Sequence, residues 1–307
     1  MLNLSIDQVL RWAPQVRLHK NEEFKPSSVD FFLQNVNLRG GSSPGALKQS
    51  NLPACNDKCH LQSKESLGGA SGTRPGFLKG ESGDVPVYAI VEDKGNGAKE
   101  ITYWTFYPYN RGKRVCIGVF WNNHCPCAEV FGNCLCPRLN GCMGGYSTFG
   151  HHVGDWERVR VRLQNGQPQW YYLWIHDSGV TNKYGGAFNW NGREFTARGI
   201  ALQNSGGHPI VYAADGSHGI WPNPGKHTYK NLGVDTLSDY TGDGGTYWNT
   251  WNNVKIVEYN KNRQYSGEFQ FLEFKGRWGN KEDGCNNPVS KLSGECILAN
   301  GPYGPPK

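Results

Sequence analysis

The segment from Gly150 to Leu163, which reads GHHVGDWERVRVRL, constrains the fold of this chain more than any other stretch. Its second half alternates strictly between arginine and an aliphatic residue, and such alternation predicts a β-strand with one buried face. Residues two apart in a strand share a face, so we expect Asp155, Glu157 and Val159 to point the same way. The strand therefore brings two carboxylates side by side.

These two carboxylates, with His151 and His152 just before them, indicate a site for a divalent cation. Two neighbouring acids stay ionised at low cost only if a cation lies between them or water surrounds both. Carboxylate oxygens suit calcium, magnesium or manganese, and imidazole nitrogens suit zinc. The alternative is that Asp155 and Glu157 form ion pairs with the arginines of the same strand, and the residues alone leave both interpretations open.

The composition is typical of a mainly β protein with short strands and long loops. The chain has 307 residues, enough for one large β domain or two small ones, with 41 glycines, 17 prolines and 13% aromatic residues. Its net charge of +6 is not gathered into a basic run, so no nucleic-acid partner is expected. The sequence also lacks the apolar run of about 18 residues that a membrane-spanning helix requires.

The ten cysteines, an even number, favour disulfides and an oxidising compartment. The N-terminal residues MLNLSIDQVLRW do not resemble a signal peptide, which conflicts with that interpretation. A leader removed before this sequence begins, unconventional export, or zinc-binding cysteines in a cytosolic protein would each resolve the conflict. We favour the removed leader, and hence a secreted protein.

Local patterns predict one short helix and several strands. Ser5 and Gln8 form a capping-box pattern for a helix over residues 5–12, which Pro14 ends. Residues 94–97, Lys-Gly-Asn-Gly, predict a hairpin turn. The expected strands lie at 15–18, 85–92, 100–107, near 169–176, at 186–190, at 210–213, and near 254–259 and 268–275.

The cysteines divide into three groups along the chain. Cys55 and Cys59 lie in residues 34–83, which lack periodicity and are expected to form a long loop. Cys285 and Cys296 enclose a short loop and predict a local disulfide. Residues 116–142 form a cysteine-rich insertion whose C-x-C pairs match structural zinc spacing poorly, so we expect disulfides at Cys116, Cys125, Cys127, Cys134, Cys136 and Cys142.

A second histidine motif lies in residues 212–222, YAADGSHGIWP, directly after the strand predicted at 210–213. Glycines on both sides of Ser217 and His218 allow a tight turn that presents the imidazole at the end of the strand. His151 and His152 precede a strand in the same way. The two histidine motifs could therefore meet at one rim of the fold.

Four motifs together resemble the vacuolar protein sorting-associated protein 62 family. They are RWAPQVRLHKNEEFKPSSVDFF (11–32), YWTFYPYN (103–110), GHHVGDWE (150–157) and YAADGSHGIWPNPGKH (212–227). This resemblance implies an intracellular trafficking protein, vacuolar or cytoplasmic. The insertion at 116–142 departs from the family pattern and favours a secreted version.

GHHVGDWE also resembles the GHRHDWE motif of necrosis- and ethylene-inducing peptide 1-like proteins. This resemblance implies a single β-sandwich over residues 1–307, similar to actinoporins and fungal lectins, with a divalent cation that engages sphingolipid sugars before membrane damage. It places Asp155 and Glu157 at the motif's two acids, and His151 or His152 at its first histidine. His218 matches the distal histidine, and Asn110 lies near the position of the upstream metal-binding aspartate.

The resemblance implies a secreted, cation-dependent binder of a glycan or glycolipid head group, with a toxin-like or defence role and calcium or magnesium as the cation. Tyr109, Trp156, Trp221 and Asp215 are candidate ligand contacts, because aromatic rings stack on sugars or lie at lipid interfaces. Core packing is the alternative for these rings. A metal-dependent hydrolase of a glycan or phosphoester, with Glu157 as general base and His218 as acid, is a further alternative, although no diagnostic hydrolase motif is present.

Overall fold

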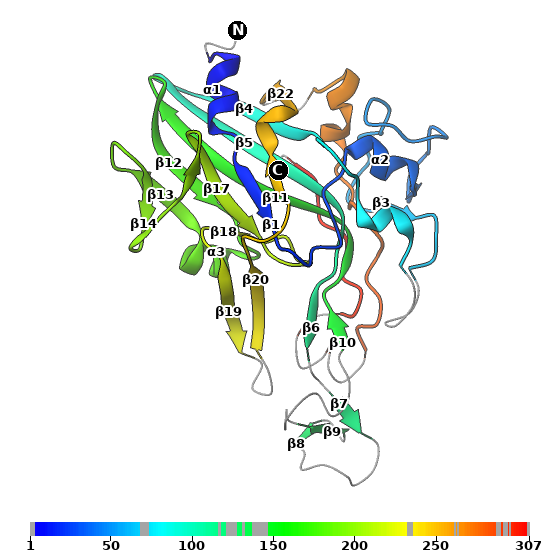
Figure 1. Ribbon diagram of the computed structural model, residues 1–307. Helices are drawn as coiled ribbons and strands as arrows, with labels where there is room; N and C mark the ends of the chain where they lie inside the picture. Colours follow the sequence, from blue (N-terminus) through cyan, green and yellow to red (C-terminus); the bar gives the residue numbers. More distant parts are fainter. Residues whose placement is uncertain are drawn as a thin grey trace.

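The computed structural model describes residues 4–67, 74–115, 118–120, 128–130, 133–136, 147–231, 236–260, 262, 264–286, 290, 294 and 296–305, and it describes side chains among these outside 114–147. The expectation of a mainly β fold is confirmed, with two large sheets, four small ones and three short α-helices in these residues (Figure 1). None of the described helices is both long and apolar enough to cross a membrane.

The larger sheet has eight strands in the order β15-β14-β13-β12-β11-β5-β4-β22. Neighbouring strands are antiparallel except β22 and β4, which run parallel. Strands β5 and β11 are long and lie at its centre. In sheet order the strands are Ile200–Ala201, Phe195–Ala197, Gly186–Trp190, Gln167–Leu173, His152–Gln164, Ala98–Asn110, Val87–Gly95 and Val254–Glu258.

The smaller sheet has the order β16-β17-β1-β21, with β18 paired to β17. Its apolar residues, such as Val16 and Val211, pack with Tyr103 and Val159 of the larger sheet in what we call the sandwich core. The expected sandwich is therefore confirmed. In the order β16, β17, β1, β21 and β18, the strands are Asn204–Ser205, His208–Ala213, Gln15–Leu18, Tyr247–Asn249 and Ile220–Trp221.

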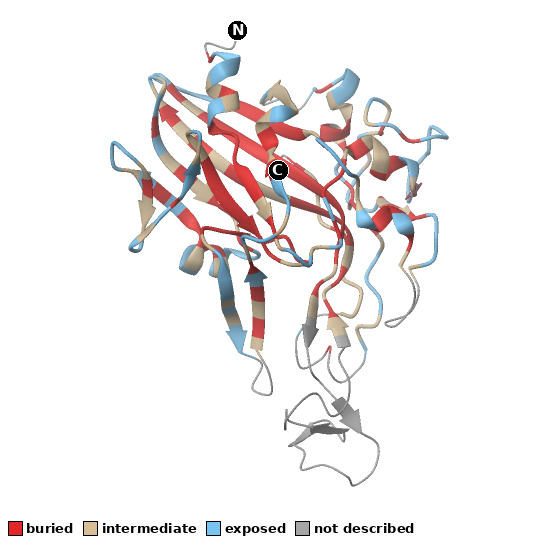
Figure 2. Cartoon of the chain, viewed as in Figure 1, coloured by how far each residue is buried: buried red, intermediate tan, exposed pale blue. Residues whose placement is uncertain are grey.

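The opposite face of the larger sheet is also covered. Helix α2 (Val29–Gln34), the hairpin of β2 (Val36–Arg39) and β3 (His60–Ser63), and the 3-10 helices η1 (Gly76–Lys79) and η3 (Gly267–Glu273) lie over it. Their apolar side chains form a second core with the large sheet, which contains Phe32, Phe106, Trp156, Phe271 and Trp278. Strands β5 and β11 are consequently buried on both faces along much of their length (Figure 2).

The other described elements lie at the ends of the sandwich. Helix α3 (Ser178–Tyr184) follows β12, and the 3-10 helix η2 (Thr250–Asn252) follows β21. Three small pairings complete the list: β6 (Lys113–Val115) with β10 (Ser147–Phe149), β19 (Gly225–Asn231) with β20 (Thr236–Thr241), and β9 (Asn133–Cys136) with both β7 (Gly118–Phe120) and β8 (Ala128–Val130).

Most of the predicted elements are confirmed. Helix α1 spans Ile6–Trp12, and the Ser5 hydroxyl accepts a hydrogen bond from the Gln8 amide at 3.2 Å. The predicted strand near 268–275 is wrong, because η3 occupies it and turns Phe271 and Leu272 into the second core. Residues 34–83 are not one loop, since they contain β2, β3 and η1.

Two predicted disulfides form in the described part of the chain, Cys55–Cys59 and Cys285–Cys296. The first fastens the segment after β2, and the second closes the short loop near the C-terminus. The six cysteines of the 116–142 insertion lie outside the described side chains.

Gly154 interrupts the alternation of β11 just before the two acids. Its φ of +67° is left-handed, and a Cβ atom there would lie 1.8 Å from the carbonyl oxygen of Trp278. Val153, before it, packs in the second core, whereas Val159, after it, belongs to the sandwich core. Gly154 therefore determines which face of the sheet Asp155 and Glu157 occupy.

We expect Gly154→Ala to destabilise the fold far more than Gly199→Ala. Gly199 has a similar φ of +74° but nothing within 4 Å of its Cβ position, so it isolates the conformational cost. That cost is about 1–2 kcal/mol, and Gly154→Ala adds a backbone collision to it. Urea denaturation of both variants measures the difference, and equal losses would show that the contact with Trp278 is unimportant.

Candidate functional site

The site lies where strand β5 ends and strand β11 begins, beside the turn after β17. Asp155 follows Gly154 on β11, Asn110 is the last residue of β5, and His218 lies in the turn. His218 has a left-handed φ of +58°, and its amide donates to the Ala214 carbonyl at 2.9 Å. The glycine-flanked turn thus brings the imidazole beside Asp155.

Asp155 is nearly enclosed, with 5% of its surface exposed. Its Oδ2 atom accepts hydrogen bonds from His218 Nδ1 at 2.9 Å and from Asn110 Nδ2 at 3.0 Å. These donors fix the carboxylate and leave its Oδ1 atom 3.9 Å from His152 Nε2. One oxygen of Asp155 is therefore used for structure, and the other faces His152.

His218 is fully buried and carries a positive charge. Burial by itself lowers its pKa, but the charges and hydrogen bonds of Glu22 and Asp155 outweigh this effect and raise the pKa to about 9. Its Nε2 atom donates to the Phe24 carbonyl at 3.0 Å and lies 3.6 Å from Glu22 Oε2, and its ring stacks on Tyr107 with centroids 3.8 Å apart. An imidazolium whose two N–H groups both donate has no lone pair for a metal.

Glu22 is the buried counterpart that the sequence did not single out. Only 2% of its side chain is exposed, and its Oε2 atom accepts a hydrogen bond from the amide of Gly216 at 2.7 Å. Burial alone would raise the pKa of Glu22, but the charge of His218 and several hydrogen bonds lower it overall. Glu22, His218 and Asp155 therefore form a buried acid–imidazolium–acid triad.

Glu157 lies two residues beyond Asp155 on the same edge of the sandwich core. Burial, and next the negative charge of Asp155, raise its pKa well above the ordinary value. No hydrogen bond to its carboxylate is found among the described residues. The positive charges of Arg158 and Lys113 act in the opposite direction, but the net effect on the pKa of Glu157 is upward.

Two of the three arginines of β11 pair with a different acid. Arg160 and Arg162 both pair with Glu100 of β5, at 3.1 Å and 3.0 Å. They project from the face opposite Glu157, as alternation in a strand requires. The ion-pair alternative for Asp155 and Glu157 is therefore not realised with these two arginines.

The two neighbouring histidines have different surroundings. His152 Nδ1 lies 2.7 Å from the Gly154 carbonyl and must donate to it, which leaves the lone pair of the neutral ring on Nε2, toward Asp155. His151 is 4% exposed, and its ring packs 5.7 Å from that of Tyr109. Of the two histidines that the sequence allowed, the structure places His152 beside the acid.

A cavity of about 480 Å³ opens beside this group. Asn110, His152 and Ser217 line it on the side of the triad, and α3 and β19 close it on the other. Lys113, Lys183 and Lys230 also line it, against one acid, Asp177. The cavity therefore combines the candidate site with a basic wall.

A second buried acid, Asp239 of β20, supports the floor of this cavity. It forms an ion pair with Lys113 and accepts hydrogen bonds from Ser217 Oγ at 2.8 Å, Trp221 Nε1 at 2.7 Å and His176 Nε2 at 2.7 Å. Burial, followed by the charge of Lys113, lowers the pKa of His176 to about 3, so its ring is neutral. An isolated aspartate in a polar strand gives no sequence signal of this role.

The side chains proposed as ligand contacts are engaged in contacts within the protein. Tyr109, Trp156 and Trp221 are 0%, 8% and 1% exposed, so their rings pack in the interior and offer no face to a sugar or lipid. Asp215 pairs with Arg111 at 2.7 Å and holds the turn that carries His218. These four residues have packing or structural roles in this structure, and their assignment as ligand contacts stays a prediction.

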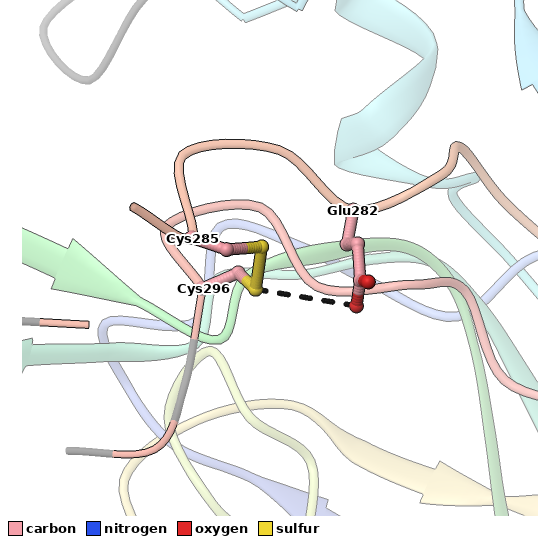
Figure 3. A group of neighbouring side chains, drawn as sticks. All are labelled: Glu282, Cys285 and Cys296. Atoms are coloured by element: carbon pink, nitrogen blue, oxygen red, sulfur yellow. Dashed lines mark hydrogen bonds between the residues drawn. A yellow bond between two sulfur atoms is a disulfide. The ribbon is translucent and has the colours of Figure 1, made fainter. Parts of the chain in front are cut away.

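Among the described residues, one group brings at least three potential metal-ligand atoms within 4.8 Å of one another: Glu282, Cys285 and Cys296 (Figure 3). Its two sulfur atoms are joined in a disulfide, so they are not thiolates and do not suit a metal. At the candidate site, the atoms left for a cation are Asp155 Oδ1 and His152 Nε2, with Glu157 on the same strand. His218 and Asn110 instead orient Asp155 through N–H donors.

The triad predicts a stability that falls in alkaline solution. The pKa of His218 rises from 6.5 to about 9 on folding, so the folded protein keeps a proton that the unfolded chain releases. This stabilisation is complete below pH 6.5 and is lost as the pH rises through about 9. We expect the free energy of unfolding, measured in urea, to fall by roughly 3 kcal/mol over that interval.

Two adjacent glutamates provide a matched control for this prediction. Glu22→Gln removes a charge beside His218, so the pKa of His218 falls and the pH dependence between 6.5 and 9 becomes smaller. Glu23 is exposed to solvent, and Glu23→Gln leaves the profile unchanged. Identical profiles for both variants would rule out Glu22 as a partner of the imidazolium.

Several solved structures align with this chain. Necrosis and ethylene inducing protein 2 from the causal agent of cocoa's witches broom disease is 11% identical, with a TM-score of 0.30, over 82% of this chain and 72% of that one. NLPPya in complex with glucosamine is 14% identical, with a TM-score of 0.35, over 96% and 92%. NLPPya in complex with mannosamine is 15% identical, with a TM-score of 0.34, over 95% and 90%.

Residues 4–127 match the family model described as vacuolar protein sorting-associated protein 62. The protein of that name from Saccharomyces cerevisiae is 24% identical over 95% of this chain and 63% of its own length, and TDA6 of the same yeast is 24% identical over 97% and 65%. The chain thus spans just under two thirds of the length of these curated relatives. Together, these matches confirm the resemblance to the vacuolar protein sorting-associated protein 62 family that the four motifs predicted.

Proposed function

We propose that this protein binds a glycan, or the sugar head group of a glycolipid, through a hard divalent cation held at Asp155, Glu157 and His152. The observation that carries the proposal is the pair of carboxylates on β11. Burial and the neighbouring Asp155 raise the pKa of Glu157 well above its ordinary value. A cation between the two acids would reverse that effect, because an opposite charge favours the ionised form.

The carboxylate oxygen of Asp155 suits such an ion, and one imidazole nitrogen lies near it. Asp155 Oδ1 and His152 Nε2 lie 3.9 Å apart, close enough to bind one cation after a small adjustment. The hydrogen bonds from His218 and Asn110 hold the carboxylate of Asp155 in place, as the outer partners of metal ligands commonly do. Calcium and magnesium accept oxygen ligands and keep open positions for water or hydroxyl groups.

The adjoining cavity of about 480 Å³ supports a ligand of sugar size. Binding pockets for small molecules typically span roughly 300–1,000 Å³. Its polar wall of Asn110, His152 and Ser217 suits hydroxyl groups. Because the aromatic candidates are packed in the interior, specificity in this proposal comes from the cation and from polar contacts.

We further propose that the protein is secreted and acts at a membrane surface. The described residues contain two disulfides and no free cysteine, which favours an oxidising compartment. A toxin-like or defence role follows if the bound head group belongs to a target membrane. Hydrolysis is less well supported, because His218 is buried with both N–H groups engaged and is not available as a general acid.

The curated relatives support a second candidate, a role in vacuolar protein sorting, because their names describe that process. The two candidate functions differ in where the protein is found, outside the cell or within it. Mass spectrometry of the protein from its native source, under non-reducing conditions, would find all ten cysteines oxidised in a secreted protein. Free thiols in the 116–142 segment would favour the trafficking role.

Calorimetric titration with calcium or magnesium tests the cation site directly. We expect Glu157→Gln and His152→Gln each to weaken binding of the cation at least about tenfold. Glu258→Gln alters an exposed acid of the same sheet and should bind like the wild type. Sugar or glycolipid-vesicle binding that survives a chelator would contradict the proposal, as would the absence of cation binding in the wild type.

Cation binding should also release a proton. The raised pKa of Glu157 means that its carboxyl group keeps its proton to a higher pH than usual, and the cation must displace that proton. Affinity should therefore increase as the pH rises toward the pKa of Glu157. Calorimetry in two buffers of different ionisation enthalpy measures the release, and Glu157→Gln should abolish it while binding, though weaker, remains measurable.

A further inference from the structure

Arg158 differs from the other two arginines of its strand. Its guanidinium lies between two indole rings, 4.6 Å from the centroid of Trp104 and 4.3 Å from that of Trp174. Arg160 and Arg162 instead share the carboxylate of Glu100. Within the described part of the chain, Arg158 has no carboxylate within 4.0 Å.

This arrangement leaves the hydrogen-bonding edge of Arg158 available. A guanidinium presents its faces to aromatic rings and all of its N–H donors along its edge. The rings of Trp104 and Trp174 offer no strong hydrogen-bond acceptor, so the N–H donors of Arg158 remain for one. The side chain is half-buried, and a cation removed from water needs an anionic or polar partner.

A cavity of about 280 Å³ lies at this position, lined by Trp104, Glu157, Arg158, Trp174, His176 and Tyr303 among others. It opens where β12 leaves the large sheet, since β11 pairs with β12 only from Val159 onward. Glu157 lines this cavity, and His176 lines both this cavity and the larger one described above. One ligand could therefore contact the cation site and Arg158 together.

We propose that this second cavity is an anion subsite, in which Arg158 pairs with a carboxylate or phosphate group on the sugar ring of the ligand. Trp174, which lines the cavity, supplies an apolar contact against which the ring packs. The inference rests on the proposed function for the ligand class and narrows it to acidic saccharides. Glu157 would repel such a group when ionised, and the cation at its carboxylate removes that repulsion.

Titration by NMR or calorimetry in saturating magnesium tests the subsite with four probes: glucose, galacturonate, glucose 6-phosphate and inorganic phosphate. We expect at least one acidic sugar to bind about tenfold or more tightly than glucose. Arg158→Gln should reduce its affinity to that of glucose and leave glucose unchanged. Arg162→Gln, on the same strand and face, should change neither affinity, because Arg160 still pairs with Glu100.

Further outcomes separate the subsite from the cation site. Arg158→Lys keeps the positive charge but loses the planar guanidinium with its paired N–H donors, so the affinity of this variant for the acidic sugar should be intermediate. If inorganic phosphate binds as tightly as glucose 6-phosphate, the ring contact with Trp174 is refuted. Cation and glucose binding without any preference for acidic sugars would overturn the subsite alone. Arg158-dependent phosphate binding without cation binding would instead overturn the proposed function, and thermal melting confirms that each variant is folded.

Discussion

The buried charge of His218 is the interaction on which the architecture of the site depends. An imidazolium without exposed surface is tolerable only because Glu22 and Asp155 surround it and the Phe24 carbonyl accepts its second proton. Through these contacts, the segment after β1, the end of β11 and the turn after β17 are joined at one point. The triad stabilises the scaffold and at the same time orients Asp155 toward His152, which lines the cavity.

The same region shows how the sheet separates structural from functional side chains. Beyond Gly154, one face of β11 carries Asp155 and Glu157 toward the sandwich core, and the other carries Trp156 and Arg158. Trp156 is enclosed by rings of the second core, whereas Arg158 lies past the edge of that cover, beside the smaller cavity. Two adjacent residues, Glu157 and Arg158, therefore place an acid and a base on opposite faces of the strand.

Local sequence patterns predicted the framework well because they reflect local physics. The alternation of β11, the cap of α1 and the Asn96-Gly97 hairpin all appear in the structure. The spaced aromatic residues of η3 led to a wrong prediction of a strand. The six-residue helix α2 was not predicted. Glu22 and Asp239 could not be identified, because their partners are distant in sequence and each occupies an ordinary polar segment. For His218, the flanking glycines indicated its position, but only its buried neighbours define it as a charged support for Asp155.

The parallel pairing of β1 with β17 matches Gln15 with Ile210, and β22 joins β4 across a similar separation. Contacts between such remote segments slow folding, since a long stretch of chain must be ordered before any of them forms. On the ribosome, residues near the N-terminus emerge long before the turn that contains His218. Glu22 must therefore remain without its imidazolium partner until about 200 further residues have been synthesised, and this acid, which is buried in the folded protein, is exposed to the solvent during that interval.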